Sequence, residues 1–322
     1  MMNRREFLGA GIGVGAAAIA AYALPGDKFR WSCTSGMFAR MTPQPQATLQ
    51  TIAKYGFHGL EATAQLADSA GSVTKFKEAL GAHNLGLATF WGGGVYWDPS
   101  AAAKVRDTVD NNIKLAREYV APCGGKYLKV NLTNRGDART APNWMTPDQM
   151  RALAGTLNEI GRGTKAAGVK FAVHPHAWTM LESEHEVRQL MALTDPTLVY
   201  LIADTAHLTL GGMDPVKFAR EWYPRIAGVH LKDTEPKYSV AKAGWKGPAP
   251  SQEEHARVNL YKNFGSGGVD FPGFIQVLRD KGYDSWVSLD FDPLRPGEGE
   301  VDSVMSMRRN YVKESLKATL AS

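Results

Sequence analysis

The chain has 322 residues, 44% of them hydrophobic, and its 37 basic and 32 acidic side chains give a formal net charge of +5. This composition excludes a mainly disordered or collagen-like chain, because there is enough apolar side chain to bury a large core. The small basic excess also argues against a nucleic-acid-binding protein, since such a surface needs clustered Lys and Arg. The largest basic clusters here are only the pairs Arg4 with Arg5 and Arg308 with Arg309.

The first 23 residues have the pattern of an export signal. The pair Arg4 and Arg5 is followed by an apolar run, rich in Gly and Ala, and by a small-x-small cleavage pattern that ends at Ala23. The paired arginines resemble the twin-arginine (Tat) signal. Because the apolar run is shorter than the ~20 residues that span a bilayer, we predict a cleaved Tat signal peptide over residues 1–23 and no stable membrane anchor. We therefore expect the Tat translocase as a partner during export, and the periplasm as the place of action.

Export to an oxidising compartment would permit a disulfide between Cys33 and Cys123. Two cysteines do not make a disulfide framework, however, and the sequence leaves the distance between them open. It also leaves the oligomeric state open: the sequence is compatible with a homo-oligomer as well as with a monomer.

Residues 24–322 alternate short β-rich runs with longer helical patterns. Two helices have recognisable starts, a capping-box pattern from Thr146 to Gln149 and the pair Asp214 and Pro215. The predicted strands are Phe29–Cys33, Gly59–Thr63, Gly86–Trp91, Tyr127–Leu132, Lys170–His176, Val199–Asp204, Ala227–Lys232 and Trp286–Asp292. These are eight strand-and-helix repeats, and no change of composition along the chain marks a second domain. The pattern therefore favours one α/β domain, a single (β/α)8 TIM barrel, over a doubly wound sheet.

A long connection follows the seventh predicted strand. Residues 234–268 are rich in Lys, Pro and Gly, and only the stretch Gln252–Leu260 has any signal of a helix or a strand. Connections of this length are uncommon unless they are functional or mobile. In a barrel this one would emerge at the catalytic end, so we expect a lid or rim, with a decorative insertion as the alternative.

Histidines, aspartates and a lysine gather where the last four predicted strands end. They are His174 and His176, Asp204 and His207, His230 and Lys232, and Asp290 and Asp292. Because barrel active sites lie at the carboxyl ends of the strands, these side chains should meet in one mouth. Burying so many ionisable groups together is costly unless charge is compensated, and a divalent metal compensates it directly. The sequence therefore predicts a metal site.

These strand ends resemble those of the xylose isomerase-like barrels, the sugar phosphate isomerase and epimerase family. The resemblance rests on Gly59-Leu60-Glu61, Asp204-Thr205-Ala206-His207, His230-Leu231-Lys232-Asp233 and the Gly-rich run from Gly265 to Phe271. It implies a barrel that acts on a sugar or glycoside and holds a divalent metal with one residue from each of the last four strands. The positions that match by motif are His174, Asp204, His230 and Asp290.

Two of these positions depart from the family pattern, which has Glu where this chain has His174 and Asp290. Imidazole and carboxylate are both good ligands, and the extra nitrogen favours Zn, Mn or Co, as well as Fe, over Mg. Epimerases of the family use two ligand glutamates to exchange a proton from opposite faces of a sugar carbon. The absence of both puts that mechanism in doubt here.

Other side chains are candidates for catalysis and substrate binding. The acid and base candidates are His176, His207, Lys232 and Asp292. Glu61 and Trp91 are expected to bind substrate, Trp91 by stacking on a sugar face. The structural alternatives are an ion pair of Lys232 with Asp233 and ordinary core packing of Trp91.

Three functions compete on this reading. The first is an exported, metal-dependent sugar isomerase or epimerase that works through an enediolate. The second, favoured by the missing glutamate pair, is a lyase or hydratase that cleaves 3-keto-glycosides by β-elimination. The third, of a different class, is a non-catalytic carbohydrate-binding barrel.

Overall fold

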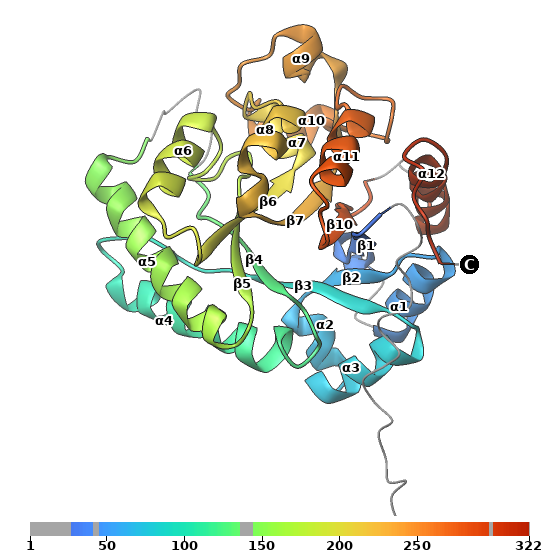
Figure 1. Ribbon diagram of the computed structural model, residues 1–322, viewed down its shortest axis with the longest axis horizontal. Coiled ribbons are helices and arrows are strands. Elements are labelled where there is room, and N and C mark those ends of the chain that lie inside the picture. Colours follow the sequence, from blue (N-terminus) through green and yellow to red (C-terminus); the bar gives the residue numbers. More distant parts are fainter. Residues whose placement is uncertain (1–26, 41–44, 136–143, 296–298, 322) are drawn as a thin grey trace, which may run out of the picture.

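The computed structural model describes residues 27–40, 45–135, 144–295 and 299–321, and the predicted signal peptide lies outside them. Eight parallel strands form a closed barrel in the order β1-β10-β7-β6-β5-β4-β3-β2 (Figure 1). The barrel strands are β1 (Arg30–Thr34), β2 (Gly59–Ala62), β3 (Gly86–Gly92), β4 (Tyr127–Asn131), β5 (Lys170–His174), β6 (Val199–Asp204), β7 (Ile226–Leu231) and β10 (Trp286–Leu289). The prediction of a single (β/α)8 barrel is confirmed.

Helices surround this barrel and bury one apolar face each against it (Figure 1). They are α1 (Pro45–Lys54), α2 (Ala64–Ser69), α3 (Val73–Ala82), α4 (Ala102–Leu115), α5 (Pro147–Ala166), α6 (Glu184–Leu193), α7 (Thr205–Leu210), α8 (Pro215–Trp222), α11 (Phe271–Asp280) and α12 (Val301–Glu314). Both predicted helix starts are confirmed: Thr146 and Gln149 form a capping box at α5, and the Asp214 carboxylate caps α8. Within the described part of the chain, no helix has the length and apolar character needed to cross a membrane.

Aromatic side chains fill the barrel interior at the amino-terminal ends of the strands. Trp286 begins β10 and Tyr127 begins β4, and both are fully buried. Glycines make room for them: a Cβ at Gly59 would lie 2.7 Å from the Trp286 ring, and one at Gly228 would lie 2.6 Å from Tyr127. With this end packed, polar side chains inside the barrel collect at the opposite, carboxyl-terminal end.

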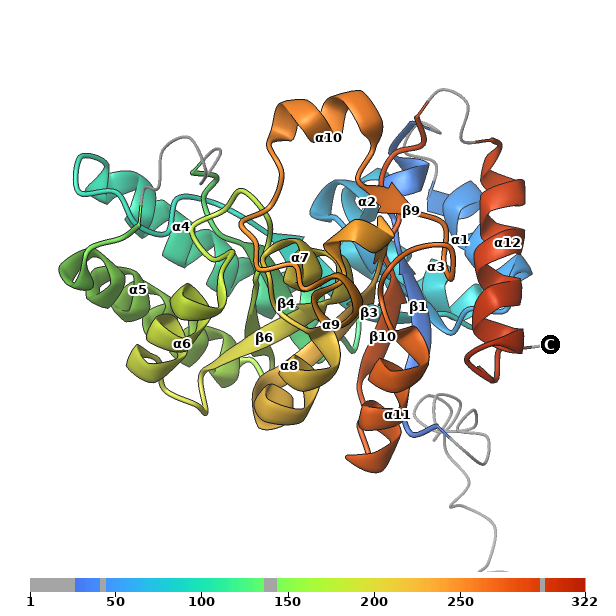
Figure 2. The same cartoon turned by 90° about the horizontal axis from the view of Figure 1, so that it is seen from above.

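The long connection after β7 is folded and lies at the carboxyl-terminal end of the barrel. It contains β8 (Asp233–Thr234), α9 (Val240–Ala243), α10 (Gln252–Val258) and β9 (Tyr261–Lys262), and β8 pairs with β9 in an antiparallel ribbon. The stretch Gln252–Leu260, for which the sequence left helix and strand open, contains α10, which stands out from the barrel in Figure 2.

Two buried carboxylates hold this connection in place. The Asp233 carboxylate accepts hydrogen bonds from the backbone N–H groups of Gly265, Gly267 and Val269, each at 3.1 Å. The Glu182 carboxylate, beyond β5, accepts one from the N–H of Ala249 at 2.9 Å. Asp233 is thus occupied by backbone donors, and the structural alternative for Lys232, an ion pair with Asp233, is not found. Cys33 and Cys123 are both buried as free thiols.

One partly buried histidine makes the fold sensitive to acid. The Nδ1 atom of His58 accepts a hydrogen bond from the N–H of Trp31 at 3.1 Å, and therefore must be unprotonated. Burial, with a smaller contribution from Arg30, lowers the pKa of His58 to about 4. Between about pH 6.5, the ordinary pKa of histidine, and pH 4, His58 binds a proton in the unfolded chain but stays unprotonated in the folded chain.

We therefore predict that His58 makes the free energy of unfolding fall as the pH drops from 6.5 to 4, by roughly 1–3 kcal/mol. In H58Q, whose amide oxygen still accepts a hydrogen bond, this part of the pH dependence should disappear. Urea unfolding at pH 7.5 and 4.5 measures it, with H185Q, at an exposed position on α6, as the matched control. Equal pH dependence in H58Q and the wild type would contradict the prediction.

Candidate metal centre

Four side chains from four neighbouring strands converge in the barrel mouth. His174 ends β5, Asp204 ends β6, His230 lies on β7, and Asp290 follows β10. All four are buried. The Asp204 Oδ2 atom lies 3.4 Å from both His174 Nε2 and His230 Nδ1, and Asp290 Oδ2 lies 4.0 Å from His230 Nδ1. The structure therefore brings together the four residues that the resemblance implied as ligands.

Three of these atoms are buried and have no hydrogen-bond partner in the part of the chain that the structure describes: His174 Nε2, Asp204 Oδ2 and His230 Nδ1. Buried polar atoms are rarely left so, and three that face one another indicate a group that would bind them all. The donor atoms of Asp204, His230 and Asp290 lie within 4.8 Å of one another, as do those of His174, Asp204 and His207. Nitrogen and carboxylate oxygen donors in this arrangement fit a divalent cation such as Zn, Mn or Co.

Hydrogen bonds on the side away from the cluster orient the side chains of His174, His230 and Asp204. His174 Nδ1 lies 2.9 Å from the side-chain oxygen of Asn131, and His230 Nε2 lies 2.8 Å from Oε1 of Glu61. Because both partners are acceptors, each ring carries its proton on that nitrogen and presents the other nitrogen to the centre. The second oxygen of Asp204, Oδ1, caps α7 by accepting from the N–H of Ala206 and His207.

Glu61 is buried and contacts several polar and charged side chains at once. Its Oε1 atom also accepts from the Ser288 hydroxyl at 2.9 Å, while Oε2 lies 3.0 Å from Lys129 Nζ and accepts from Trp91 Nε1 at 3.1 Å. Burial alone would raise the pKa of the Glu61 carboxyl, but His230 and Lys129 hold it below its ordinary value. Conversely, burial opposes the charge on His230, yet Glu61 raises its pKa to about 9. A carboxylate so fully occupied argues against the direct substrate contact that we expected of Glu61.

Beside the cluster, two histidines stack face to face. The rings of His176 and His207 have their centroids 3.5 Å apart and their planes at 30°. His176 Nδ1 lies 2.8 Å from the carbonyl oxygen of Ala177 and donates to it, whereas His207 Nδ1 accepts from the N–H of Ala177 at 3.4 Å. The backbone of Ala177 therefore selects opposite tautomers for the two histidines. Nε2 of His176 has a free lone pair, whereas Nε2 of His207 carries a proton.

Both stacked histidines are held neutral. Burial in the mouth lowers the pKa of His176 and of His207 below the ordinary value. His207 is buried, and His176 remains partly exposed to the mouth. A neutral ring with a free lone pair can act as a base, and the neutral ring beside it, with a proton on Nε2, can donate a hydrogen bond to a substrate oxygen.

Lys232 pairs with the two aspartates that follow β10. Its Nζ atom lies 2.9 Å from Asp290 Oδ2, 2.7 Å from Asp292 Oδ2 and 4.0 Å from the centre of the Tyr261 ring. Burial would lower the pKa of Lys232, but Asp290 and Asp292 raise it well above its ordinary value. Lys232 is therefore a permanent cation that can donate protons in hydrogen bonds but cannot serve as a base at neutral pH.

Several residues of this site were not in our prediction. Lys129 lies buried on β4 between Glu61 and the Trp91 ring, 4.1 Å from the ring centre. A lysine within the apolar strand Tyr127–Asn131 was the available signal for it, and period-two alternation places Asn131 on the same side. Trp91 keeps 36% of its surface exposed, which is compatible with the expected stacking on a substrate.

The segment after β7 supplies further unpredicted neighbours. Tyr261, on β9, packs on His207, and its ring centroid also lies 4.8 Å from that of His255. His255 is partly buried and contacts Trp178. Nothing in the local sequence pattern indicates these contacts, because the segment folds back over the mouth.

We predict that E61Q weakens zinc binding by about 10–100-fold, because an amide orients and polarises the His230 ring less strongly than a carboxylate. H230A should lose the metal more completely, since it removes a ligand atom. Elemental analysis after dialysis and competition with a coloured chelator measure both effects, and E78Q, an exposed change on α3, is the matched control. A correctly folded wild type that retains none of Zn, Mn and Co would contradict the assignment.

Comparison with known proteins agrees with this geometry. Residues 49–311 match the family model described as "Xylose isomerase-like TIM barrel". The chain is 26% identical over 249 residues to an inosose dehydratase of Clostridium botulinum, covering 75% of this chain and 80% of the relative. Among solved structures it is similar in fold to 3-keto-D-glucoside 4-epimerase from E. coli (TM-score 0.67, 16% identity, 87% of this chain and 97% of that chain) and to the IOLI protein with a bound zinc atom (TM-score 0.69, 13% identity, 90% and 98%). The chain belongs to the xylose isomerase-like TIM barrel family.

Proposed function

We propose that this protein is a metal-dependent lyase of the dehydratase type, which eliminates a β-oxygen from a cyclic keto sugar or keto polyol. The observation that carries the proposal is the stacked pair of His176 and His207, locked in opposite tautomers beside the donor cluster. An elimination needs a base for the C–H proton and a hydrogen-bond donor for the leaving oxygen, and the pair supplies one of each. The similarity to an inosose dehydratase supports the same reaction class.

The donor cluster of His174, Asp204, His230 and Asp290 would hold the cation. A bound divalent ion would supply Lewis acidity that polarises a ketone and makes the neighbouring C–H bond more acidic. The IOLI protein, which is similar in fold, binds a zinc atom, and this supports a cation at such a site. Glu61 and Asn131 hold the ligand rings in place, and Lys129 keeps Glu61 ionised.

In the proposed reaction His176 Nε2 takes the proton from the carbon next to the ketone. The C–H electron pair becomes the new C=C bond, and the C–O bond to the β-oxygen breaks. His207 Nε2–H donates a hydrogen bond to that oxygen, and the proton taken by His176 passes to it, so that it leaves as water or an alcohol. Both rings thereby return to their starting neutral forms. Lys232, a fixed cation in the mouth, favours negative charge that develops on substrate oxygen.

The same geometry argues against our first hypothesis, an isomerase or epimerase. An epimerase exchanges a proton from two opposite faces and needs two comparable bases. Here the positions on β5 and after β10 hold His174 and Asp290, of which Asp290 is tied to Lys232. Similarity to the 3-keto-glucoside epimerase rests on fold alone and does not select its reaction.

We predict that the protein converts a keto polyol to a product lighter by one water, and frees the alcohol from a 3-keto-glucoside. In D2O, mass spectrometry distinguishes this from epimerisation, which would give deuterium exchange with the hydroxyl or alcohol retained. H176A should lower kcat by about 100-fold or more, since it removes the base. H185A, on the exposed face of α6, is the control. Exchange without elimination would favour the epimerase, and sugar binding without turnover in Zn, Mn or Co would favour the binding barrel.

We also propose that the protein acts in the periplasm after export by the Tat pathway, on the basis of Arg4, Arg5 and the apolar run that follows them. Replacing both arginines by lysine should keep the protein in the cytoplasm, because the translocase reads the arginine pair. Cell fractionation and the mass of the exported chain measure this, and the wild type should begin at Leu24. Equal export of the double variant would contradict the proposal.

A further inference from the structure

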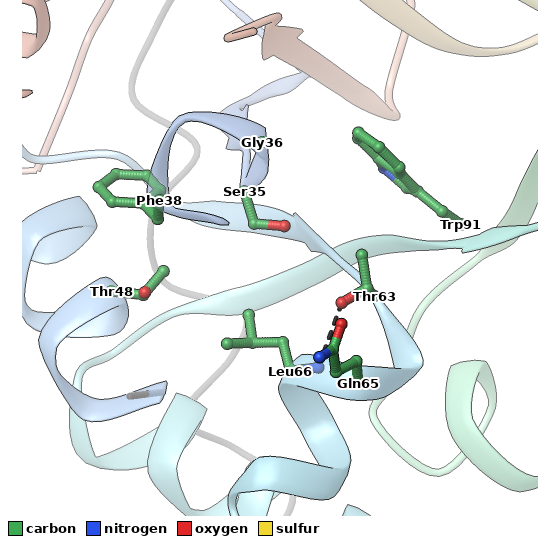
Figure 3. A pocket seen from close by; sticks show the side chains of 8 residues that line it. All are labelled: Ser35, Gly36, Phe38, Thr48, Thr63, Gln65, Leu66 and Trp91. Carbon is green, nitrogen blue, oxygen red and sulfur yellow. Dashed lines mark hydrogen bonds between the residues drawn. The ribbon is translucent and has the colours of Figure 1, made fainter. Parts of the chain in front are cut away.

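A small pocket opens in the half of the barrel mouth that lies away from the donor cluster. Ser35 follows β1, Thr63 follows β2, and Trp91 lies near the end of β3 (Figure 3). The donor cluster lies instead on β5, β6, β7 and β10. Since all these residues are at the carboxyl ends of their strands, the pocket and the cluster share one mouth.

The size of the pocket suits a single ring. Its volume is about 170 Å³. An engineered protein cavity of roughly 150 Å³ binds benzene, so this pocket has room for one six-membered ring. The reactive sugar ring belongs at the donor cluster, and the pocket therefore has room for a second one.

The lining of the pocket indicates a neutral, partly polar ring. Phe38 and Trp91 stand on opposite sides of it in Figure 3, and Leu66 adds a third apolar surface. Hydroxyl and amide groups come from Ser35, Thr63 and Gln65. Apolar walls with a few placed polar groups are typical of small-molecule sites, and aromatic faces suit sugar or aryl rings. None of the described residues that line the pocket is charged, which argues against a phosphate group.

Trp91 links the pocket to the centre. Its Nε1 atom donates to Glu61 Oε2 at 3.1 Å, and Glu61 Oε1 accepts from His230 Nε2 at 2.8 Å. The Glu61 carboxylate thus connects the Trp91 indole to the imidazole of His230, one of the four residues of the donor cluster. Lys129 lies over the Trp91 ring, while the exposed part of the indole faces the pocket. A ring in the pocket would therefore lie next to a sugar held at the cluster.

We propose that this pocket binds the ring attached to the leaving oxygen, so that the substrate is a keto-glycoside with a neutral six-membered aglycone rather than a free keto sugar. This inference rests on the proposed lyase function, which by itself allows water or an alcohol as the leaving group. The aglycone is an aryl group or a second sugar, and both share the chemistry that the lining recognises.

The test compares methyl, phenyl and glucosyl β-glycosides of 3-ketoglucose with the metal-loaded protein. We expect kcat/KM for the phenyl or glucosyl compound to exceed that of the methyl compound by about tenfold, the upper range for one aromatic contact. Whichever of the two is preferred identifies the kind of ring. Equal kcat/KM for all three compounds would overturn the proposal.

Two variants locate the preference in the pocket. L66W fills it, and should lower the ratio of phenyl to methyl kcat/KM toward one. Because Leu66 is buried and its replacement could disturb folding, Q65A serves as a second variant: Gln65 is exposed, and its loss should reduce the glucosyl preference. Q50A, exposed on α1 outside the pocket, is the matched control and should change nothing. Unchanged ratios in both L66W and Q65A would also overturn the proposal.

Failure of the lyase function is distinguishable from failure of the pocket. If no keto-glycoside is turned over, calorimetry with phenyl and methyl β-glucoside still reports on the pocket. Tighter binding of the phenyl compound that L66W abolishes would support the pocket without the reaction. Equal binding of both compounds would exclude it.

Discussion

The Glu61 carboxylate is buried in the barrel mouth and binds side chains from four other strands: Trp91 on β3, Lys129 on β4, His230 on β7 and Ser288 on β10. A carboxylate removed from water needs such partners, because the free-energy cost of burying an unpaired charge is far larger than the stabilisation from one hydrogen bond. This requirement ties the metal-ligand side of the mouth to the pocket side. It also sets the His230 tautomer, and with it the atom that faces the donor cluster.

Charges in the mouth are arranged in two linked groups. Lys129 neutralises Glu61, while Lys232 neutralises Asp290 and Asp292. Among the described residues, Asp204 has no basic partner other than histidines, and its own Oδ2 and two neighbouring ring nitrogens, His174 Nε2 and His230 Nδ1, have no hydrogen-bond partner. The negative charge left at this point is what makes the cluster suitable for a cation. The neutral lining of the neighbouring pocket, in contrast, suits the part of a substrate that takes no part in bond breaking.

The segment after β7 gives this mouth its upper wall. Asp233 and Glu182 bind its backbone, so it is fixed to the barrel by buried hydrogen bonds on two sides. Tyr261 then reaches both Lys232 and His207. A wall of this kind limits water around the stacked histidines, which strengthens the electrostatic interactions among the groups that would transfer protons.

The sequence by itself determined the elements of the barrel and the polar residues at or just beyond the ends of its strands, although β5 ends at His174 and β10 at Leu289, before the predicted ends at His176 and Asp292. These features depend on local patterns: strand alternation, the caps at Thr146 and Asp214, and the polar residues that follow apolar runs. It also placed His174, Asp204, His230 and Asp290 at one end of the barrel, because parallel strands share an end. Only the tertiary structure decided that Glu61 supports His230, that Ala177 sets two tautomers, and that Lys232 pairs with Asp290 rather than Asp233. Glu61 and His230 are 169 positions apart in the chain, and no local pattern encodes a hydrogen bond between side chains at that separation.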